Sequence, residues 1–310
     1  MLDSKITDRK SGILLYGLTP PKKEYSPDKI SEIAQKQFLR IKDLNIDGLV
    51  LYDIQDEAAR TDSQRPFPFL PTIDPVEYYS RYLSLLNKPI IAYNCVGKYT
   101  QDEFIKWLGQ MGTYRMQYAV FVGAASKNQA VNLTIRQAYE MKKMYNEDMI
   151  LGGVTIPERH ITKSDEHLRL LEKVTNGCRF FISQAVYNIE ATKDFLSDLF
   201  YYSNQNEKQI VPIIFTLTPC GSIKTLEFME WLGISIPKWL KNDLINSIDV
   251  LNKSLDICYR ISEELIHFCS EKKIPVGFNI ESVSIRKAEI DASVELLARV
   301  ENLLKRSFSA

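Results

Sequence analysis

The segment GCRFFISQAVYN (residues 177–188) has the pattern of a buried parallel strand that carries one polar side chain. Its apolar, β-prone residues form a nearly continuous run, which is typical of a strand covered on both faces. Gln184 is the exception, because burying a bare amide costs about 1–3 kcal/mol. The Gln184 amide therefore either pairs with neighbouring backbone in the core or meets a ligand that offers a donor and an acceptor side by side.

Seven more runs of this kind occur along the chain, and each run is followed by a segment with helical periodicity. The eight runs cover residues 12–18, 48–54, 89–96, 118–124, 149–156, 178–187, 211–218 and 274–283. Helices are expected over residues 26–44, over 164–174 behind a Ser–Asp cap, and over 288–304. Eight strand-then-helix units predict an α/β fold, a (β/α)8 TIM barrel forming a single domain over residues 1–310. A doubly wound sheet is disfavoured because no GxGxxG follows the first strand.

Two connections are longer than the barrel needs. Residues 55–75 follow the second strand and are rich in proline, charge and phenylalanine, and residues 218–240 follow the seventh strand. A further long helix is expected at about residues 242–270. Long excursions on a compact domain tend to be functional, so we expect both to flank the mouth of the barrel.

The overall composition excludes several classes of protein. The 310 residues carry 39 basic and 39 acidic side chains, so the chain lacks the basic footprint of a nucleic-acid binder. No apolar run approaches the roughly 20 residues of a membrane helix, and the N-terminus lacks the apolar core of a signal peptide. We expect a cytoplasmic protein with no nucleic-acid or membrane partner.

Cysteine and histidine give little support for a metal centre. The five cysteines are scattered singly without CxxC spacing, which favours buried thiols over disulfides. His160 and His167 lie seven residues apart, and His267 sits on an amphipathic segment. No zinc spacing emerges, so no metal site is predicted.

Candidate site residues lie at the carboxyl ends of the strands, where barrel proteins place their active sites. Acids, amides and arginines gather there, which suits an anionic or amide-rich small molecule. For each acid the alternative is a helix cap or a salt bridge to an adjacent loop. No nucleophile elbow or Walker loop appears, which argues against a hydrolase or kinase. The candidates are Tyr52, Asp53, Gln55, Glu57, Asn94, Gly123, Glu158, Arg159, Gln184, Thr216, Thr218, Asn279, Glu281 and Arg286.

Several segments together resemble the methylenetetrahydrofolate reductase family over nearly the whole chain. They are YGLTPPK at the first strand, the block from PERH to GCRFFISQAVYN, the segment VPIIFTLTPCGSIKTLEFMEWLGISIPKWL, and the last-strand block ending in Arg286. The most specific element is ISQ-x-x-Y-N followed by a proline-bearing strand and an IPxW helix start.

The resemblance implies an oxidoreductase of one-carbon metabolism and methionine biosynthesis. Such an enzyme reduces 5,10-methylenetetrahydrofolate to 5-methyltetrahydrofolate, with NAD(P)H as hydride source and FAD as carrier. By position, Gln184 matches a pterin contact, Arg286 a residue near the benzoyl-glutamate end of the folate, and Lys173 a lysine at the FAD diphosphate. We assign Thr218 to the substrate as well. Tyr52, Asn94, Gly123 and Glu158 are further cofactor-binding candidates.

Other family positions differ in this chain. Gly17 stands where the family has its general-acid glutamate on the first strand, and Ala92 and Glu172 replace a histidine and an arginine at the flavin. Residues 122–124 read Val-Gly-Ala instead of Arg-Gly-Asp. The chain then either binds FAD through different groups or transfers hydride directly from NAD(P)H. We expect Glu57 or Glu281 to supply the proton.

Two other classes of function remain alternatives. The chain could be a folate-binding transferase or lyase that kept the pterin site and lost the redox cofactor. It could also be a non-catalytic partner subunit, which the loss of an acid at Gly17 favours. The sequence leaves open whether it forms a homo-oligomer, whether NADH or NADPH is used, and the direction of flux.

Overall fold

The computed structural model describes residues 1–57, 64–124 and 130–308. Its eight strands follow one another in sequence order around a closed barrel, which confirms the predicted fold class. Each strand falls inside one of the eight apolar runs, because these side chains are buried nearly without exception. The strands are β1 (Ile13–Leu18), β2 (Gly48–Leu51), β3 (Ile90–Cys95), β4 (Tyr118–Val122), β5 (Ile150–Thr155), β6 (Cys178–Ala185), β7 (Ile213–Leu217) and β8 (Val276–Glu281).

The contacts divide the chain into two compact units. The larger unit comprises residues 1–16 and 153–310, and the smaller unit comprises residues 17–152. Strands β1 and β5 each run from one unit into the other. That both units make up a single domain stays a prediction.

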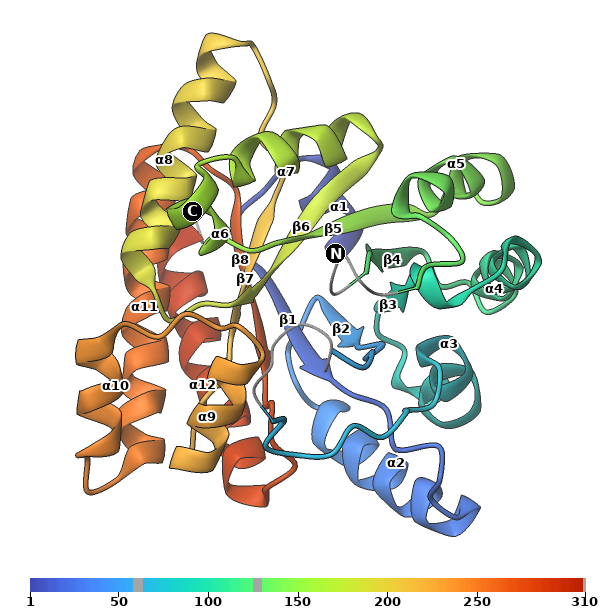
Figure 1. Cartoon of the computed structure of the whole chain (residues 1–310), viewed down its shortest axis with the longest axis horizontal. Coiled ribbons are helices and arrows are strands. Elements are labelled where there is room, and N and C mark those ends of the chain that lie inside the picture. The colour runs from blue at the N-terminus through green and yellow to red at the C-terminus, as the bar shows by residue number, and fades with distance from the viewer. Residues whose placement is uncertain (58–63, 125–129, 309–310) are drawn as a thin grey trace. The chain divides into compact units, whose positions relative to one another are not determined.

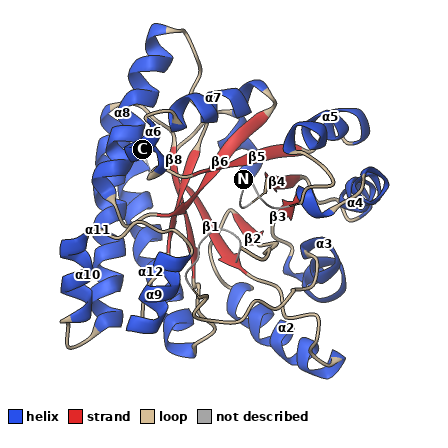
Figure 2. Ribbon diagram, in the orientation of Figure 1, coloured by secondary structure: helices blue, strands red, loops and turns tan. Residues whose placement is uncertain are grey.

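In the larger unit, β6, β7 and β8 are joined by parallel pairs such as Phe181 with Ile213 and Phe215 with Phe278. Helices pack along these strands (Figures 1 and 2), and α11 contacts both α8 and α12. The helices of this unit are α1 (Leu2–Thr7), α6 (Arg159–Lys163), α7 (Glu166–Thr175), α8 (Ile189–Gln205), α9 (Ile223–Trp231), α10 (Lys238–Ile245), α11 (Val250–Glu271) and α12 (Lys287–Phe308).

In the smaller unit, β2, β3, β4 and the first half of β5 pair in parallel, with Leu49 opposite Ile90 and Ala92 opposite Ala119. Its α-helices are α2 (Pro27–Ile41), α3 (Pro75–Tyr78), α4 (Gln101–Thr113) and α5 (Ile135–Tyr145). A π-helix at Tyr79–Leu83 follows α3, and short 3-10 helices lie at Ser84–Leu86 and Val96–Lys98. Ser26 caps α2 by accepting the Lys29 N–H, as the helical signal at residue 26 indicates.

Two helix predictions are wrong in detail. The long helix expected at about residues 242–270 is two helices, α10 and α11, and Asp249 caps the second by accepting the Asn252 N–H. The Ser–Asp cap expected before α7 also fails, because Asp165 occupies the cap position but its side chain accepts no capping hydrogen bond. The Asp165 carboxylate is therefore available for another role.

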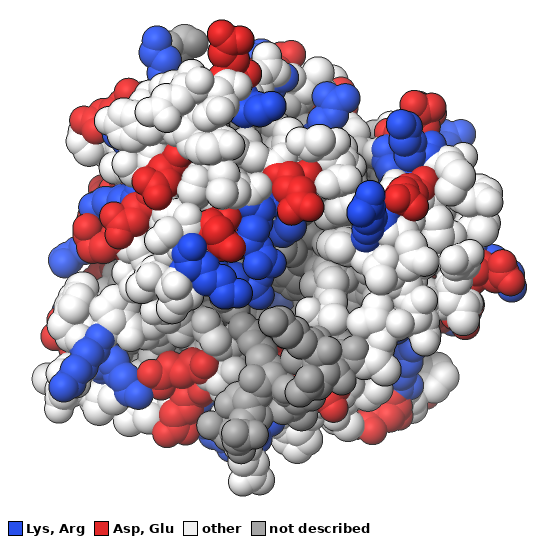
Figure 3. Space-filling view, turned by 45° about the horizontal axis from the view of Figure 1, so that its top comes forward, with Lys and Arg blue, Asp and Glu red and all other residues white. Residues whose placement is uncertain are grey.

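The excursion after β2 is only partly described, since residues 58–63 lie outside the described ranges. Its end is tied to the smaller unit by an antiparallel bridge between Lys22 and Thr72, and Asp74 caps α3. Within the described ranges, none of the helices is both long and apolar enough to cross a membrane. Acidic and basic side chains are interspersed over the face shown in Figure 3.

The cysteines agree with the expectation of buried thiols. All five are free and buried, and none forms a disulfide. Burial raises the pKa of Cys220 to about 11 and that of Cys258 to about 12.

Candidate functional site

Gln184 lies one residue before the end of β6, where the register between β6 and β7 shifts between Ile182 and Ala185. Irregular pairing of this kind re-aims side chains near a site. The Gln184 Nε2 donates to the Leu232 carbonyl oxygen at 2.9 Å. Its Oε1 is buried and accepts no hydrogen bond from the described residues. One half of the amide is thus held by backbone, and the other half is open to a donor.

Hydrogen bonds between polar residues link β6, β7 and β8 near Gln184, close to the ends of these strands. The Thr216 N–H donates to Ser183 Oγ at 3.0 Å, and the Thr216 hydroxyl donates to the Ser183 carbonyl oxygen at 2.7 Å. Asn279 Nδ2 donates to Thr216 Oγ1 at 3.2 Å. Thr218 is fully buried, and its hydroxyl accepts the Val283 N–H at 3.3 Å. Thr218 therefore positions the loop after β8, and its predicted substrate contact stays untested.

Two candidates from the last strand and its loop are accessible. Glu281 ends β8 and is partly exposed. The Arg286 side chain is 59% exposed, and its Nε lies 3.8 Å from Glu289 Oε2. Glu289 is buried and accepts the Gly221 N–H at 2.7 Å, and its Cγ lies 2.5 Å from the place of a Cβ added at residue 221. This contact fixes the loop after β7 against α12, and Arg286 forms an ion pair with the same carboxylate while its side chain stays largely exposed.

Glu158 and Lys173 lie close to a second acid, Glu166. Glu158 is buried with no hydrogen-bond partner for its carboxyl oxygens among the described residues. Burial, assisted by the charge of Glu166, raises the pKa of Glu158 to about 8. The Lys173 Nζ donates to the Val154 carbonyl oxygen at 2.6 Å, and burial lowers the pKa of Lys173.

The contacts of Lys173 do not test its predicted place at the diphosphate of FAD. A diphosphate needs N–H donors and positive charge. One Lys173 N–H is taken by the Val154 carbonyl oxygen, and the charges of Glu166, Arg159 and Arg169 all act on the ammonium. Glu166 itself accepts the Thr155 hydroxyl at 3.0 Å and the Ile156 N–H at 2.9 Å, so it is fixed in place. The predicted cofactor roles of Glu158 and Lys173 therefore gain no support from their contacts.

In the smaller unit, the ends of β2 and β3 are joined by an ion pair between the buried Asp53 and the Lys98 side chain, which is 44% exposed. Both Asp53 carboxylate oxygens accept from Lys98 Nζ at 2.7 Å, and Oδ2 also accepts the Cys95 N–H at 2.7 Å. The Asp53 side chain is only 6% exposed. Asn94 is fully buried beside Tyr99, whose hydroxyl donates to Asp74. Asp53 and Asn94 thus lie inside the unit and shape it.

The remaining candidates of the smaller unit lie near the described ends of its loops. Gln55 Nε2 donates to the Gly123 carbonyl oxygen at 3.2 Å, which joins two of the predicted positions. Tyr52 packs edge-on against Tyr93 with ring centroids 4.8 Å apart. Glu57 lies near Arg65. Burial lowers the pKa of Arg65, and the negative charges of Asp56 and Glu57 raise it. No contact tests the roles predicted for Tyr52, Gly123 and Glu57.

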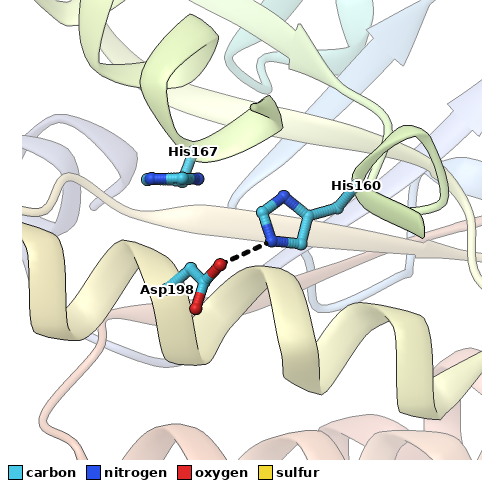
Figure 4. A group of neighbouring side chains, drawn as sticks. All are labelled: His160, His167 and Asp198. Atoms are coloured by element: carbon cyan, nitrogen blue, oxygen red, sulfur yellow. Dashed lines mark hydrogen bonds and ion pairs between the residues drawn. The ribbon is translucent and has the colours of Figure 1, made fainter. Parts of the chain in front are cut away.

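The structure also brings together three residues that the sequence did not connect. His160 on α6, His167 on α7 and Asp198 on α8 converge in the larger unit (Figure 4). His160 Nε2 lies 2.9 Å from Asp198 Oδ2, and the two imidazole centroids are 5.3 Å apart. Asp198 is far from both histidines in sequence, so no local motif could have indicated the group.

The chain forms a closed eight-stranded barrel. At or after its strand ends lie the Gln184 amide with an unpaired oxygen, the partly exposed Glu281 and the exposed Arg286. Such a set suits a polar, anionic small molecule. The family model described as methylenetetrahydrofolate reductase matches residues 128–269. A solved structure titled as an uncharacterised protein from Clostridium thermocellum that binds two copies of 5-methyl-5,6,7,8-tetrahydrofolic acid is 52% identical. It covers 97% of this chain and 99% of that chain, with a TM-score of 0.86. The chain belongs to the methylenetetrahydrofolate reductase family.

More distant matches show the fold alone. A chitinase domain from Pyrococcus furiosus aligns with a TM-score of 0.55 at 11% identity, covering 94% of this chain and 95% of that chain. A search of curated proteins gave no match.

Proposed function

We propose that this chain binds a reduced folate at the carboxyl ends of β6 to β8 and acts on its one-carbon group. The observation that carries the proposal is the half-open amide of Gln184, whose Oε1 is buried without a partner among the described residues. A pterin ring carries an amino group and ring N–H donors along one edge, which an amide oxygen can accept. The folate bound by the Clostridium thermocellum protein supports the same ligand class here.

The accessible charges suit the other parts of a folate. Arg286 follows β8 as an exposed cation, and a guanidinium pairs well with the carboxylates of a benzoyl-glutamate tail. Glu281 ends β8, and Gln184 lies one residue before the end of β6. Because active sites of barrels lie at the carboxyl ends of the strands, we favour Glu281 as the group that protonates folate N10, in place of the acid missing at Gly17.

The reaction that family membership supports best is reduction of 5,10-methylenetetrahydrofolate to 5-methyltetrahydrofolate with NAD(P)H. NAD(P)H supplies the hydride when it is bound. Because Ala92, Glu172 and residues 122–124 differ from the residues that the family has at the flavin, we derive no step through FAD. The contributions of this chain are to hold the pterin edge at Gln184 and to deliver a proton from Glu281.

Absorbance and turnover of the purified protein test the reaction. We expect colourless protein that oxidises NADH or NADPH only when methylenetetrahydrofolate is added, with Glu281→Gln lowering turnover by about 10²–10⁴-fold. Glu57→Gln is the matched comparison and should retain turnover. A flavin spectrum stoichiometric with protein would contradict the flavin-free route. Absence of turnover in either direction, with folate still bound, would contradict the reductase activity.

A second function is favoured by Gly17 and by the differences at Ala92 and Glu172 from the flavin residues of the family. A transferase or lyase that binds reduced folate without a redox cofactor needs neither the general acid nor the flavin contacts. It predicts folate binding and folate-dependent one-carbon transfer with no consumption of NAD(P)H. A non-catalytic partner subunit predicts binding alone.

Replacing Gln184 by alanine tests folate binding itself. We expect Gln184→Ala to weaken binding of 5-methyltetrahydrofolate by about 1–3 kcal/mol, because the pocket loses an amide acceptor. Isothermal titration calorimetry measures the affinity, and circular dichroism checks the fold. Gln110→Ala, at an exposed position of α4, is the control and should bind like the unaltered protein. Equal affinities of all three proteins would mean that the amide serves the core.

A further inference from the structure

We propose that His160, His167 and Asp198 form a binding site for a divalent transition-metal ion of the zinc type. One ring nitrogen from each histidine and one carboxylate oxygen of Asp198 lie within 4.8 Å of one another. Imidazole and carboxylate are ligands that zinc takes at about 2.0–2.2 Å, and two histidines with one carboxylate is a recurrent set for open metal sites. The proposal is independent of folate binding.

Both imidazoles are buried, and one of them has an unused ligand atom. The His160 ring is 5% exposed and turns Nε2 toward Asp198. The His167 residue is 8% exposed, and its Nδ1 is buried without a hydrogen-bond partner among the described residues. Buried polar atoms are nearly always paired, so this nitrogen needs a partner that the described residues do not supply.

The rings are held in place by aromatic packing. His160 packs edge-on against Phe195, and His167 packs edge-on against Tyr202, with centroid distances of 6.1 and 5.4 Å. Both aromatic residues lie on α8, as does Asp198, so one face of this helix supports the whole group. Figure 4 shows the His160 ring turned toward the Asp198 carboxylate, with the His167 ring near both. A supported set of this kind keeps its geometry without the ion.

The charges around the group also favour a cation. Asp165 lies near His167 and exerts its negative charge on it, and Asp165 Oδ1 is buried without a partner because it caps no helix. In the described part of the chain, neither Asp165 nor Asp198 forms an ion pair with lysine or arginine. The charge of two carboxylates would be neutralised by one divalent ion. Asp165 is a candidate fourth ligand.

The ion has a route to this site. The Asp198 side chain is 55% exposed, so it can turn toward the rings and shorten the 4.8 Å spread to metal-bond distances. On binding, Asp198 and His160 exchange their mutual hydrogen bond for bonds to the ion, and the proton of the imidazole moves to Nδ1, so that Nε2 can bind the ion.

Titration of the intact chain with Zn²⁺, and with Co²⁺ as a spectroscopic substitute, tests the proposal. We expect one ion per chain, a Co²⁺ spectrum of nitrogen and oxygen ligands without thiolate bands, and a rise in Tm on addition of Zn²⁺. Asp198→Asn and His167→Gln should each weaken binding by at least about tenfold. Asp198→Asn alters an exposed side chain, so it tests the site even if the histidine variant folds poorly.

Two matched controls separate this site from others. Asp194→Asn makes the same charge change on α8, and His267→Gln removes an exposed histidine that lies 3.4 Å from Glu271. Both should bind within about twofold of the unaltered chain. The proposal is overturned if the unaltered chain binds neither ion, if Asp198→Asn binds as tightly as the unaltered chain, or if only His267→Gln loses binding.

Discussion

Replacing Lys98 by methionine is expected to destabilise the protein by about 3–5 kcal/mol, because it leaves the Asp53 carboxylate buried without its cation. Lys98 Nζ donates to both Asp53 carboxylate oxygens. Without Lys98, the Cys95 N–H still donates to this carboxylate, but the Asp53 side chain is only 6% exposed and gains little solvation from water. The free energy of unfolding in urea at neutral pH measures the effect.

The double variant Lys98→Met with Asp53→Asn separates the charge from the packing. Once the acid is neutral, loss of Lys98 should cost much less, so the two substitutions should not be additive. Lys106→Met, at an exposed position of α4, is the control and should stay within about 0.5 kcal/mol of the unaltered protein. If Lys98→Met lowers the free energy of unfolding equally with Asp53 and with Asn at that position, Lys98 stabilises the protein only through the packing of its aliphatic chain.

The second large effect concerns Glu158 and depends on pH. The pKa of this buried carboxyl is raised to about 8 from an ordinary 4.5. Between these values the folded chain keeps a proton that the unfolded chain has lost, so stability falls as the pH rises through this range. Each pKa unit corresponds to about 1.4 kcal/mol, so the loss above pH 8 is on the order of 5 kcal/mol.

Glu158→Gln should therefore flatten the pH dependence of unfolding between pH 5 and 8 and make the variant the more stable protein above pH 8. Urea unfolding at a series of pH values gives the slope, which is independent of any constant cost of the amide. Glu172→Gln, at an exposed position of α7, should leave the slope unchanged. Parallel curves for unaltered protein and Glu158→Gln would show that the carboxyl ionises freely in the folded state.

The strands could be predicted from the sequence because barrel strands are buried on both faces and read as continuous apolar runs. The end of a helix at residue 245 could not be predicted from the sequence. Ile248 fits a helical pattern, yet it is fully exposed in the break between α10 and α11, and the Asp249 cap that ends the break looks like any surface acid. Apolar spacing alone does not distinguish these cases.

The site was predictable only in part. The need of Gln184 for a partner followed from its strand, but its two halves differ because Leu232, from the turn after α9, takes one of them. Thr218 was predicted to lie on the seventh strand but follows its last residue, and its hydroxyl is occupied by the loop that follows β8. The group of His160, His167 and Asp198 depends on the packing of three helices, which no spacing in the sequence encodes.

The burial of every cysteine has a practical consequence. Only the thiolate is nucleophilic, and thiols with a pKa of about 11 or 12 are almost entirely protonated at neutral pH. Alkylating reagents should thus modify the native chain slowly and the unfolded chain fast. Trapping of the five sulfhydryls, counted by mass spectrometry, would then report how often each part of the barrel opens.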